Sequence, residues 1–146
     1  MKKLLASCFL PLLAACSGNP PADLGLREQT FKPCPDKPNC VNSFAAAADT
    51  GHAIAPLRPA PGQTLDTLWS ALPPVLKDRD IRLVEMTADY LRAEATTPLM
   101  RFVDDLEFYR DTTQGVIQVR SASRIGYSDL GKNRSRLEDI RTALQP

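Results

Sequence analysis

The densest group of side chains capable of chemistry lies in one short segment near the C-terminus. Residues 120–136, RSASRIGYSDLGKNRSR, hold five basic side chains and one acid, Asp129, in a 146-residue chain whose formal charge is only +1. Guanidinium groups bind carboxylate or phosphate oxygens two at a time. This arginine-serine segment therefore has the composition of an anion site.

The surroundings of the segment could supply further donors. A predicted strand ends within it and a predicted helix begins near Asn133, where free amides and a partial positive charge favour anions. The candidate ligand-binding residues are Asp104, Asp105, Arg120, Ser121, Ser123, Arg124, Tyr127, Ser128, Asp129, Asn133, Arg134 and Arg136. An internal alternative stays open, in which Arg120 and Arg124 pair with Asp104, Asp105 or Asp129 and hold the loop to the sheet.

The charge of the chain is polarised. Without Lys2 and Lys3, which belong to an N-terminal signal, the chain has 16 basic and 17 acidic residues. Outside the arginine-serine segment it then has 11 basic and 16 acidic residues, a formal charge of −5. This acidic remainder argues against nucleic acid as a partner. It leaves an anionic small molecule, a lipid headgroup, or an acidic segment of a partner protein.

Catalytic patterns are weak by comparison. Asp104 and Asp105 are adjacent on a predicted strand and point to opposite faces, which is wrong for two carboxylates that flank one bond. His52 is the only histidine, and the serines of the segment lack the surroundings of a nucleophile. We favour a non-enzymatic module without cofactor or metal. The alternative is a hydrolase or transferase that acts on envelope material with Asp105 and His52.

The first residues predict location. MKKLLASCFLPLLAAC has a basic start, a short apolar run and small residues before Cys16, the layout of a secretory signal over residues 1–15. The tetrad LAAC resembles the bacterial lipobox, which implies cleavage before Cys16 and acylation of its thiol. The alternative is an ordinary cleaved signal. Because Ser17 rather than aspartate follows, we expect an outer-membrane lipoprotein that faces the periplasm, with the membrane as partner through its lipid.

Proline and cysteine organise the next part of the chain. Residues 16–33 are expected to form the lipidated cysteine and a flexible tether, since they are rich in proline and glycine without apolar periodicity. Cys34 and Cys40 form an even pair across a turn-prone loop and predict a disulfide in an oxidising compartment. Zinc and redox roles fit their spacing poorly. Residues 34–146 are expected to form a single globular domain.

Periodicity predicts the elements of this domain. An amphipathic helix starts after Thr64, a residue that can cap it, and Pro73 and Pro74 are expected to break or kink it. A closing helix from about Asn133 has apolar positions Leu137, Ile140 and Leu144. Between the helices, strands are predicted over residues 81–86, 90–97, 99–110 and 116–121, with short turns that favour antiparallel pairing.

These elements predict an α+β fold. The expected architecture is a two-layer sandwich, in which an antiparallel four-stranded sheet carries the helices on one face and leaves the other face open. Alternation places Asp104 on the same side as Phe102, Leu106 and Phe108, which is the core side. A lone buried carboxylate costs several kcal/mol. Either an arginine meets Asp104 or a bulge turns it outward.

Several motifs carry a family resemblance. CPDKPNCVNS, HAIAPL, YLRAEA, FVDDLEF and VRSASRIGYSDLGKNRSR, in this order, resemble the domain of unknown function 1499 family, here as a bacterial lipoprotein member. The resemblance covers residues from about 34 to 144, and its most specific part is the arginine-serine segment. One small departure is Asn42, where the family usually has serine. The resemblance implies one intact domain and no reaction.

Overall fold

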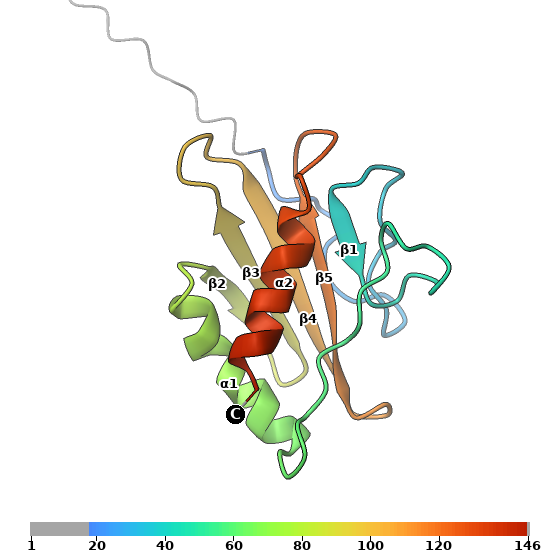
Figure 1. The fold of residues 1–146 in the computed structure, drawn as a ribbon, viewed down its shortest axis with the longest axis vertical. Coiled ribbons are helices and arrows are strands. Elements are labelled where there is room, and N and C mark those ends of the chain that lie inside the picture. The colour runs from blue at the N-terminus through green and yellow to red at the C-terminus, as the bar shows by residue number, and fades with distance from the viewer. Residues whose placement is uncertain (1–17, 146) are drawn as a thin grey trace, which may run out of the picture.

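The computed structural model describes residues 18–145 and contains two helices and five strands. In chain order they are β1 (Cys40–Asn42), α1 (Leu65–Lys77), β2 (Arg82–Met86), β3 (Tyr90–Thr96), β4 (Val103–Asp111), β5 (Val116–Ser123) and α2 (Lys132–Ala143). The strands form one open antiparallel sheet in the order β1-β5-β4-β3-β2, with both helices on one face (Figure 1). The fold is α+β, with five strands where four were predicted.

The additional strand is β1. It consists of three residues between a proline-rich loop and a turn, too few to show a period of two in the sequence. It pairs with β5, so that Cys40 lies opposite Ala122 and Asn42 opposite Arg120. The predicted succession of hairpins from β2 to β5 is confirmed.

Helix α1 begins as predicted but extends further. The side chain of Thr64 accepts a hydrogen bond from the backbone amide of Thr67. The helix then continues through Pro73 and Pro74 to Lys77. Each proline removes one intrahelical donor, while burial of Leu72 and Leu76 on the sheet favours continuation. Neither helix within residues 18–145 is long and apolar enough to cross a bilayer.

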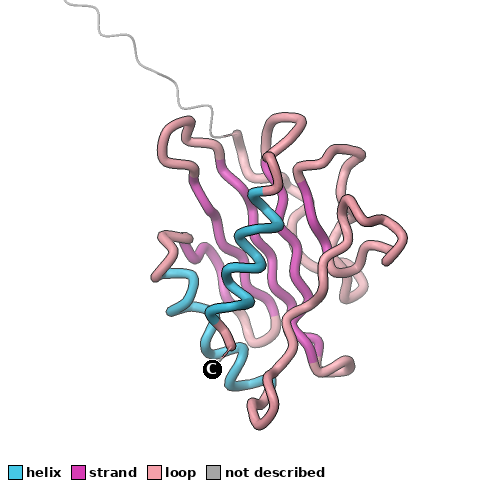
Figure 2. The backbone as a smooth tube through the Cα atoms, viewed as in Figure 1, coloured by secondary structure: helices cyan, strands magenta, loops and turns pink. Residues whose placement is uncertain are grey.

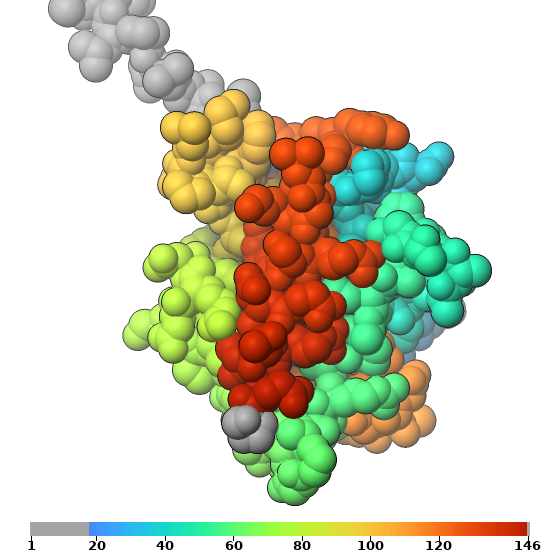
Figure 3. Space-filling model, viewed as in Figure 1, coloured from blue at the N-terminus to red at the C-terminus, as the bar shows by residue number. Residues whose placement is uncertain are grey.

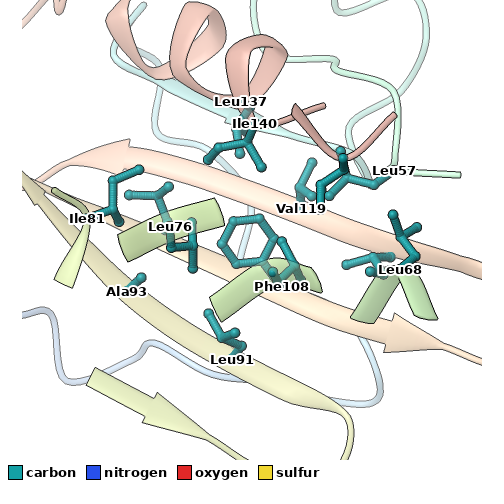
Figure 4. Close-up of a cluster of buried hydrophobic side chains, with 14 of the residues drawn as sticks. Leu57, Leu68, Leu76, Ile81, Leu91, Ala93, Phe108, Val119, Leu137 and Ile140 are labelled. Carbon is teal, nitrogen blue, oxygen red and sulfur yellow. The ribbon is translucent and has the colours of Figure 1, made fainter. Parts of the chain in front are cut away.

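The main core lies between the helices and the sheet. Phe108 and Val119 are fully buried at its centre, and Leu137 and Ile140 of α2 pack onto them as predicted (Figure 4). Leu144 is also buried, just after the end of α2. The apolar periodicity of the sequence therefore identified the face of α2 that contacts the sheet.

Strand β4 begins later than predicted. Residues 99–102 form a loop because two hydrogen bonds close a turn around them. The amide of Thr97 donates to the carbonyl of Phe102 at 2.8 Å, and the amide of Phe102 donates to the hydroxyl of Thr97 at 2.9 Å. Arg101 within this loop has a positive φ of 56°, which a strand does not permit. As a result Phe102 is partly exposed instead of lying in the core.

The face of the sheet opposite the helices, here the far face, is not open as expected. The N-terminal segment, residues 18–35, runs behind the sheet in Figure 1. Phe31 is only 4% exposed and packs with Tyr90 and Tyr109 of the far face. The carbonyl of Lys32 accepts a hydrogen bond from Asn42 Nδ2 at 3.1 Å. Residues expected to form a tether therefore contact the sheet.

We predict that Phe31 contributes to stability as a core residue does. Phe31→Ala should lower the free energy of unfolding by about 3 kcal/mol, since it removes a buried aromatic ring and leaves a cavity. Arg27→Ala, an exposed change in the same segment, should lower it by less than about 0.5 kcal/mol. Urea denaturation of both variants measures this. Equal small effects would show that the segment is not packed on the sheet.

Candidate functional site

The arginine-serine segment spans the end of β5, a loop, and the first turns of α2. Its strand residues alternate in direction, so Ser121 and Ser123 face α2 while Arg120 lies on the far face. The side chains of the candidate site are thus divided between two faces of the sheet, and one ligand cannot contact all of them.

The start of α2 already has an internal anion. Gly131, in a left-handed conformation with φ of 77°, is the N-cap residue and offers no side chain. Instead Asp129 accepts hydrogen bonds from the backbone amides of Gly131, at 2.9 Å, and Asn133, at 2.7 Å. This carboxylate occupies the place that the sequence suggested for an external anion.

Asn133 joins α2 to β5 and to the residue just before β1. It is 1% exposed, and its Nδ2 donates to the carbonyl of Asn39, at 3.1 Å, and to Ser123 Oγ, at 3.0 Å. Its Oδ1 accepts from the hydroxyl of Ser121. These bonds satisfy a buried amide, and they make Asn133 and both serines part of the internal frame.

Asp104 meets an arginine, one of the two outcomes expected for a carboxylate on the core side. Arg136 Nη2 of α2 lies 2.7 Å from Asp104 Oδ2. Arg134, two residues earlier, donates to the backbone carbonyls of Ala53, at 2.8 Å, and Gly51, at 3.1 Å. Arg134 and Arg136 therefore fasten α2 to other parts of the chain.

Arg120 forms a buried ion pair at the centre of the far face. Its Nη1 lies 3.0 Å from Glu107 Oε2, and the two side chains are 2% and 0% exposed. Glu107 Oε1 also accepts from Tyr90 Oη, at 2.9 Å, and from the amide of Gly25, at 2.7 Å. Burial, reinforced by the charge of Glu107, raises the pKa of Tyr90, so its phenol stays protonated and donates.

Arg124 is the centre of a second charged cluster on this face. Its guanidinium donates to both oxygens of Asp105, at 2.7 and 2.8 Å, and to Glu94 at 2.5 Å. The hydrogen bonds to Asp105, and to a smaller extent the one to Glu94, raise the pKa of Arg124. Burial alone would raise the pKa of Glu94, but hydrogen bonds from Arg124 and Arg82 outweigh it and hold this pKa below its usual value.

The sequence did not identify two of these carboxylates. Of the acids that the sequence suggests as partners, Asp105 binds Arg124, but Glu94 also binds Arg124 and Glu107 binds Arg120. Alternation already places Glu107 on one face with Asp105. The missing information was register, since Glu107 lies directly opposite Arg120 only when β4 and β5 are paired.

A cavity opens beside these clusters on the far face. It has a volume of about 420 Å³ and lies between the N-terminal segment and the end of β5. Its ionisable lining residues are Asp23, Lys32, Asp105, Arg120 and Arg124. Three cations and two acids give this lining a formal charge of +1. The end of β5 at Ser123 also borders it, although the Ser123 side chain bonds to Asn133 on the other face. Tyr127, 70% exposed, is not among the lining residues.

The disulfide between Cys34 and Cys40 is confirmed, and Cys34 forms part of the cavity wall. It joins the end of the N-terminal segment to β1, with 5.6 Å between the Cα atoms. Within residues 18–145 no group of three or more histidine, cysteine or acidic side chains is arranged to hold a metal ion.

The two residues of the catalytic alternative lie apart. His52 bonds to Asp49 through Nδ1, at 2.8 Å, and to the carbonyl of Lys37 through Nε2, at 3.0 Å. Both hydrogen bonds raise the pKa of His52, and the bond to Asp49 has the larger effect. His52 lines a different cavity from Asp105, and Asp105 is bound by Arg124. The structure therefore does not bring Asp105 and His52 to one place.

The fold and its charged clusters define a small α+β domain in which buried charges are matched by internal partners. The chain belongs to the family described as "Protein of unknown function (DUF1499)", which it matches over residues 30–144. The family resemblance of the sequence motifs is thus confirmed. Neither the curated proteins nor the solved structures include a match to this chain.

We predict that the domain loses stability when one member of the Glu107–Arg120 ion pair is removed, and regains most of it when both members are replaced. Arg120→Met should destabilise the domain by about 3–5 kcal/mol, because it leaves a buried carboxylate without its cation. Adding Glu107→Gln should restore most of this loss, since a neutral amide oxygen still accepts from Tyr90 and Gly25. Denaturation of the single and double variants tests it. Additive losses would contradict the proposed coupling.

Proposed function

We propose that this protein is a lipid-anchored, non-enzymatic binding module of the bacterial cell envelope, held at the outer membrane and facing the periplasm. Support for the anchor comes from the sequence of residues 1–17, which lie outside the described residues. The disulfide agrees with an oxidising compartment, where such bonds persist.

We further propose that the module binds a small anionic group in the cavity beside Arg120 and Arg124. The observation that carries this is the lining itself: Lys32, Arg120 and Arg124 converge on a cavity of about 420 Å³. Arg120 Nε, a buried donor, has no hydrogen-bond partner among residues 18–145. A buried donor left unpaired costs about 1–3 kcal/mol. A ligand oxygen that accepted from Arg120 Nε would remove this cost and so bind more tightly.

Lys32 is the cation best able to respond to a ligand. Its side chain is 23% exposed and its one carboxylate partner, Asp23, belongs to the same N-terminal segment and is 50% exposed. Arg120 and Arg124, in contrast, are committed to buried carboxylates. The two arginines would provide fixed positive charge in the cavity wall. Lys32 would leave Asp23 and bind a phosphate or carboxylate group instead. This group could belong to a lipid headgroup, an envelope polymer or an acidic protein segment.

We predict that Lys32→Gln weakens the binding of inorganic phosphate at least about five-fold, by the loss of one charge-assisted contact. Lys37→Gln is the matched control, because Lys37 is exposed and does not line the cavity. Titration followed by phosphorus NMR at two salt concentrations measures both affinities. Equal losses in the two variants, or binding unaffected by salt, would refute the site.

The anchor makes a separate prediction. The mature chain from bacterial membranes should carry diacylglycerol on an N-terminal Cys16, visible as the added mass of its first peptide. Cys16→Ser should give a chain without this mass that leaves the membrane fraction, because each acyl methylene contributes about 0.8 kcal/mol to membrane binding. A chain cleaved elsewhere, with an unmodified thiol at Cys16, would show an ordinary secreted protein.

A further inference from the structure

Exposed apolar side chains are concentrated at one end of the domain. Eight large apolar residues are exposed within residues 18–145, and six of these lie on two loops. They are Leu99, Met100 and Phe102 between β3 and β4, and Ile125, Tyr127 and Leu130 between β5 and α2. Leu99 and Leu130 are 89% and 91% exposed, so they contribute nothing to the core. Their exposure costs free energy in water unless another surface covers them.

The two loops are neighbours. They leave adjacent ends of β4 and β5, where the amide of Arg124 donates to the carbonyl of Val103 at 3.1 Å. Both project beyond the same end of the sheet, opposite the C-terminus (Figure 2). In the space-filling view they cap the upper end of the molecule (Figure 3). We call residues 97–102 and 124–131 together the tip.

The described chain also begins at the tip. The carbonyl of Gly18 accepts from Arg124 Nη1 at 3.3 Å, and a Cβ atom placed on Gly18 would lie 3.3 Å from Ile125 Cγ2. Gly18 is thus in contact with the loop that carries Ile125. Cys16 is only two residues earlier in the sequence, and two residues reach at most about 7 Å. A lipid on Cys16 would therefore enter the bilayer directly beside the tip.

We propose that the tip lies in the interfacial layer of the bilayer that holds the anchor, with its apolar side chains among the lipids. This inference rests on the proposed acylation of Cys16. The chemistry of the tip fits such a surface: leucine and methionine bury in the acyl boundary, and Tyr127 combines an apolar ring with a polar hydroxyl. Arg101 and Lys132, both exposed, flank the apolar residues and can reach anionic headgroups.

The position of the anchor favours lipid over a protein partner as the occupant. With no more than one residue between Cys16 and Gly18, the domain cannot stand clear of the membrane while Gly18 stays bound to Arg124. The opposite end of the domain presents the turn after β4, where Thr112, Thr113 and Gln114 are polar and exposed. The tip is thus apolar and the opposite end is polar, as expected if the tip faces the membrane and the opposite end faces water.

The test uses the full acylated chain in vesicles of phosphatidylethanolamine and phosphatidylglycerol that contain a lipid brominated near its headgroup. Tyr127→Trp places a quenchable indole at the tip, and Thr113→Trp places one at the opposite end. Trp69 is buried in the core and contributes equally to both variants. We expect the bromolipid to reduce the fluorescence at position 127 about two-fold, as for an interfacial side chain, and to leave position 113 unchanged.

A second variant tests whether the apolar residues are responsible. Adding Leu99→Ser and Leu130→Ser to Tyr127→Trp should weaken the quenching clearly, because the tip then lies close to the headgroups without inserting between the lipids. Thermal unfolding should stay unchanged because both leucines are exposed. Mass analysis of the same samples reports acylation of Cys16. Acylated protein with no quenching at position 127, or with quenching that both serine substitutions leave unchanged, overturns the docking of the tip but not the anchor. Absence of acylation overturns both.

Discussion

A buried ion pair between Glu107 and Arg120 governs the far face of the sheet. Two charges removed from water are costly unless they are matched and hydrogen bonds satisfy most of their remaining groups. Here the second carboxylate oxygen is satisfied by Tyr90 and by the amide of Gly25. The N-terminal segment must therefore lie against the sheet, since it supplies one of these donors and shields the pair. The apolar contact of Phe31 with Tyr90 and Tyr109 holds the segment against the sheet, where Gly25 can donate to Glu107.

The same logic explains why four arginines of the basic segment bind partners within the domain. Arg120, Arg124 and Arg136 each bind a carboxylate contributed by another strand. Arg134 binds backbone carbonyls of a distant loop. The positive charge of the arginine-serine segment is thus distributed over partners far apart in the sequence and joins β3, β4, β5 and α2. The ligand site that we propose, the cavity wall beside Lys32, is therefore smaller than the composition of the segment suggested.

Local patterns predicted most of the fold because they depend on local physics. The cap at Thr64, the hairpins and the core face of α2 follow from hydrogen bonding and periodicity along the chain. The rest depends on contacts between distant residues. Strand β1 exists only because β5 offers an edge to pair with, and the partners of Arg120 follow from strand register. The N-terminal segment lacks periodicity since it packs through single anchors such as Phe31.

These contacts also bear on where the domain begins. A chain that started at residue 34 would lack Gly25 and Phe31, so Glu107 would lose a donor and the far face would be open to water. The family match begins at residue 30, just before Phe31, which agrees with a domain that includes part of this segment. Because the segment runs from Gly18 at the tip to the disulfide at Cys34, it links the end that we place at the membrane to the wall of the cavity. Under the proposed anchor, a ligand that displaces Asp23 from Lys32 would act on the one segment that joins the domain to its lipid.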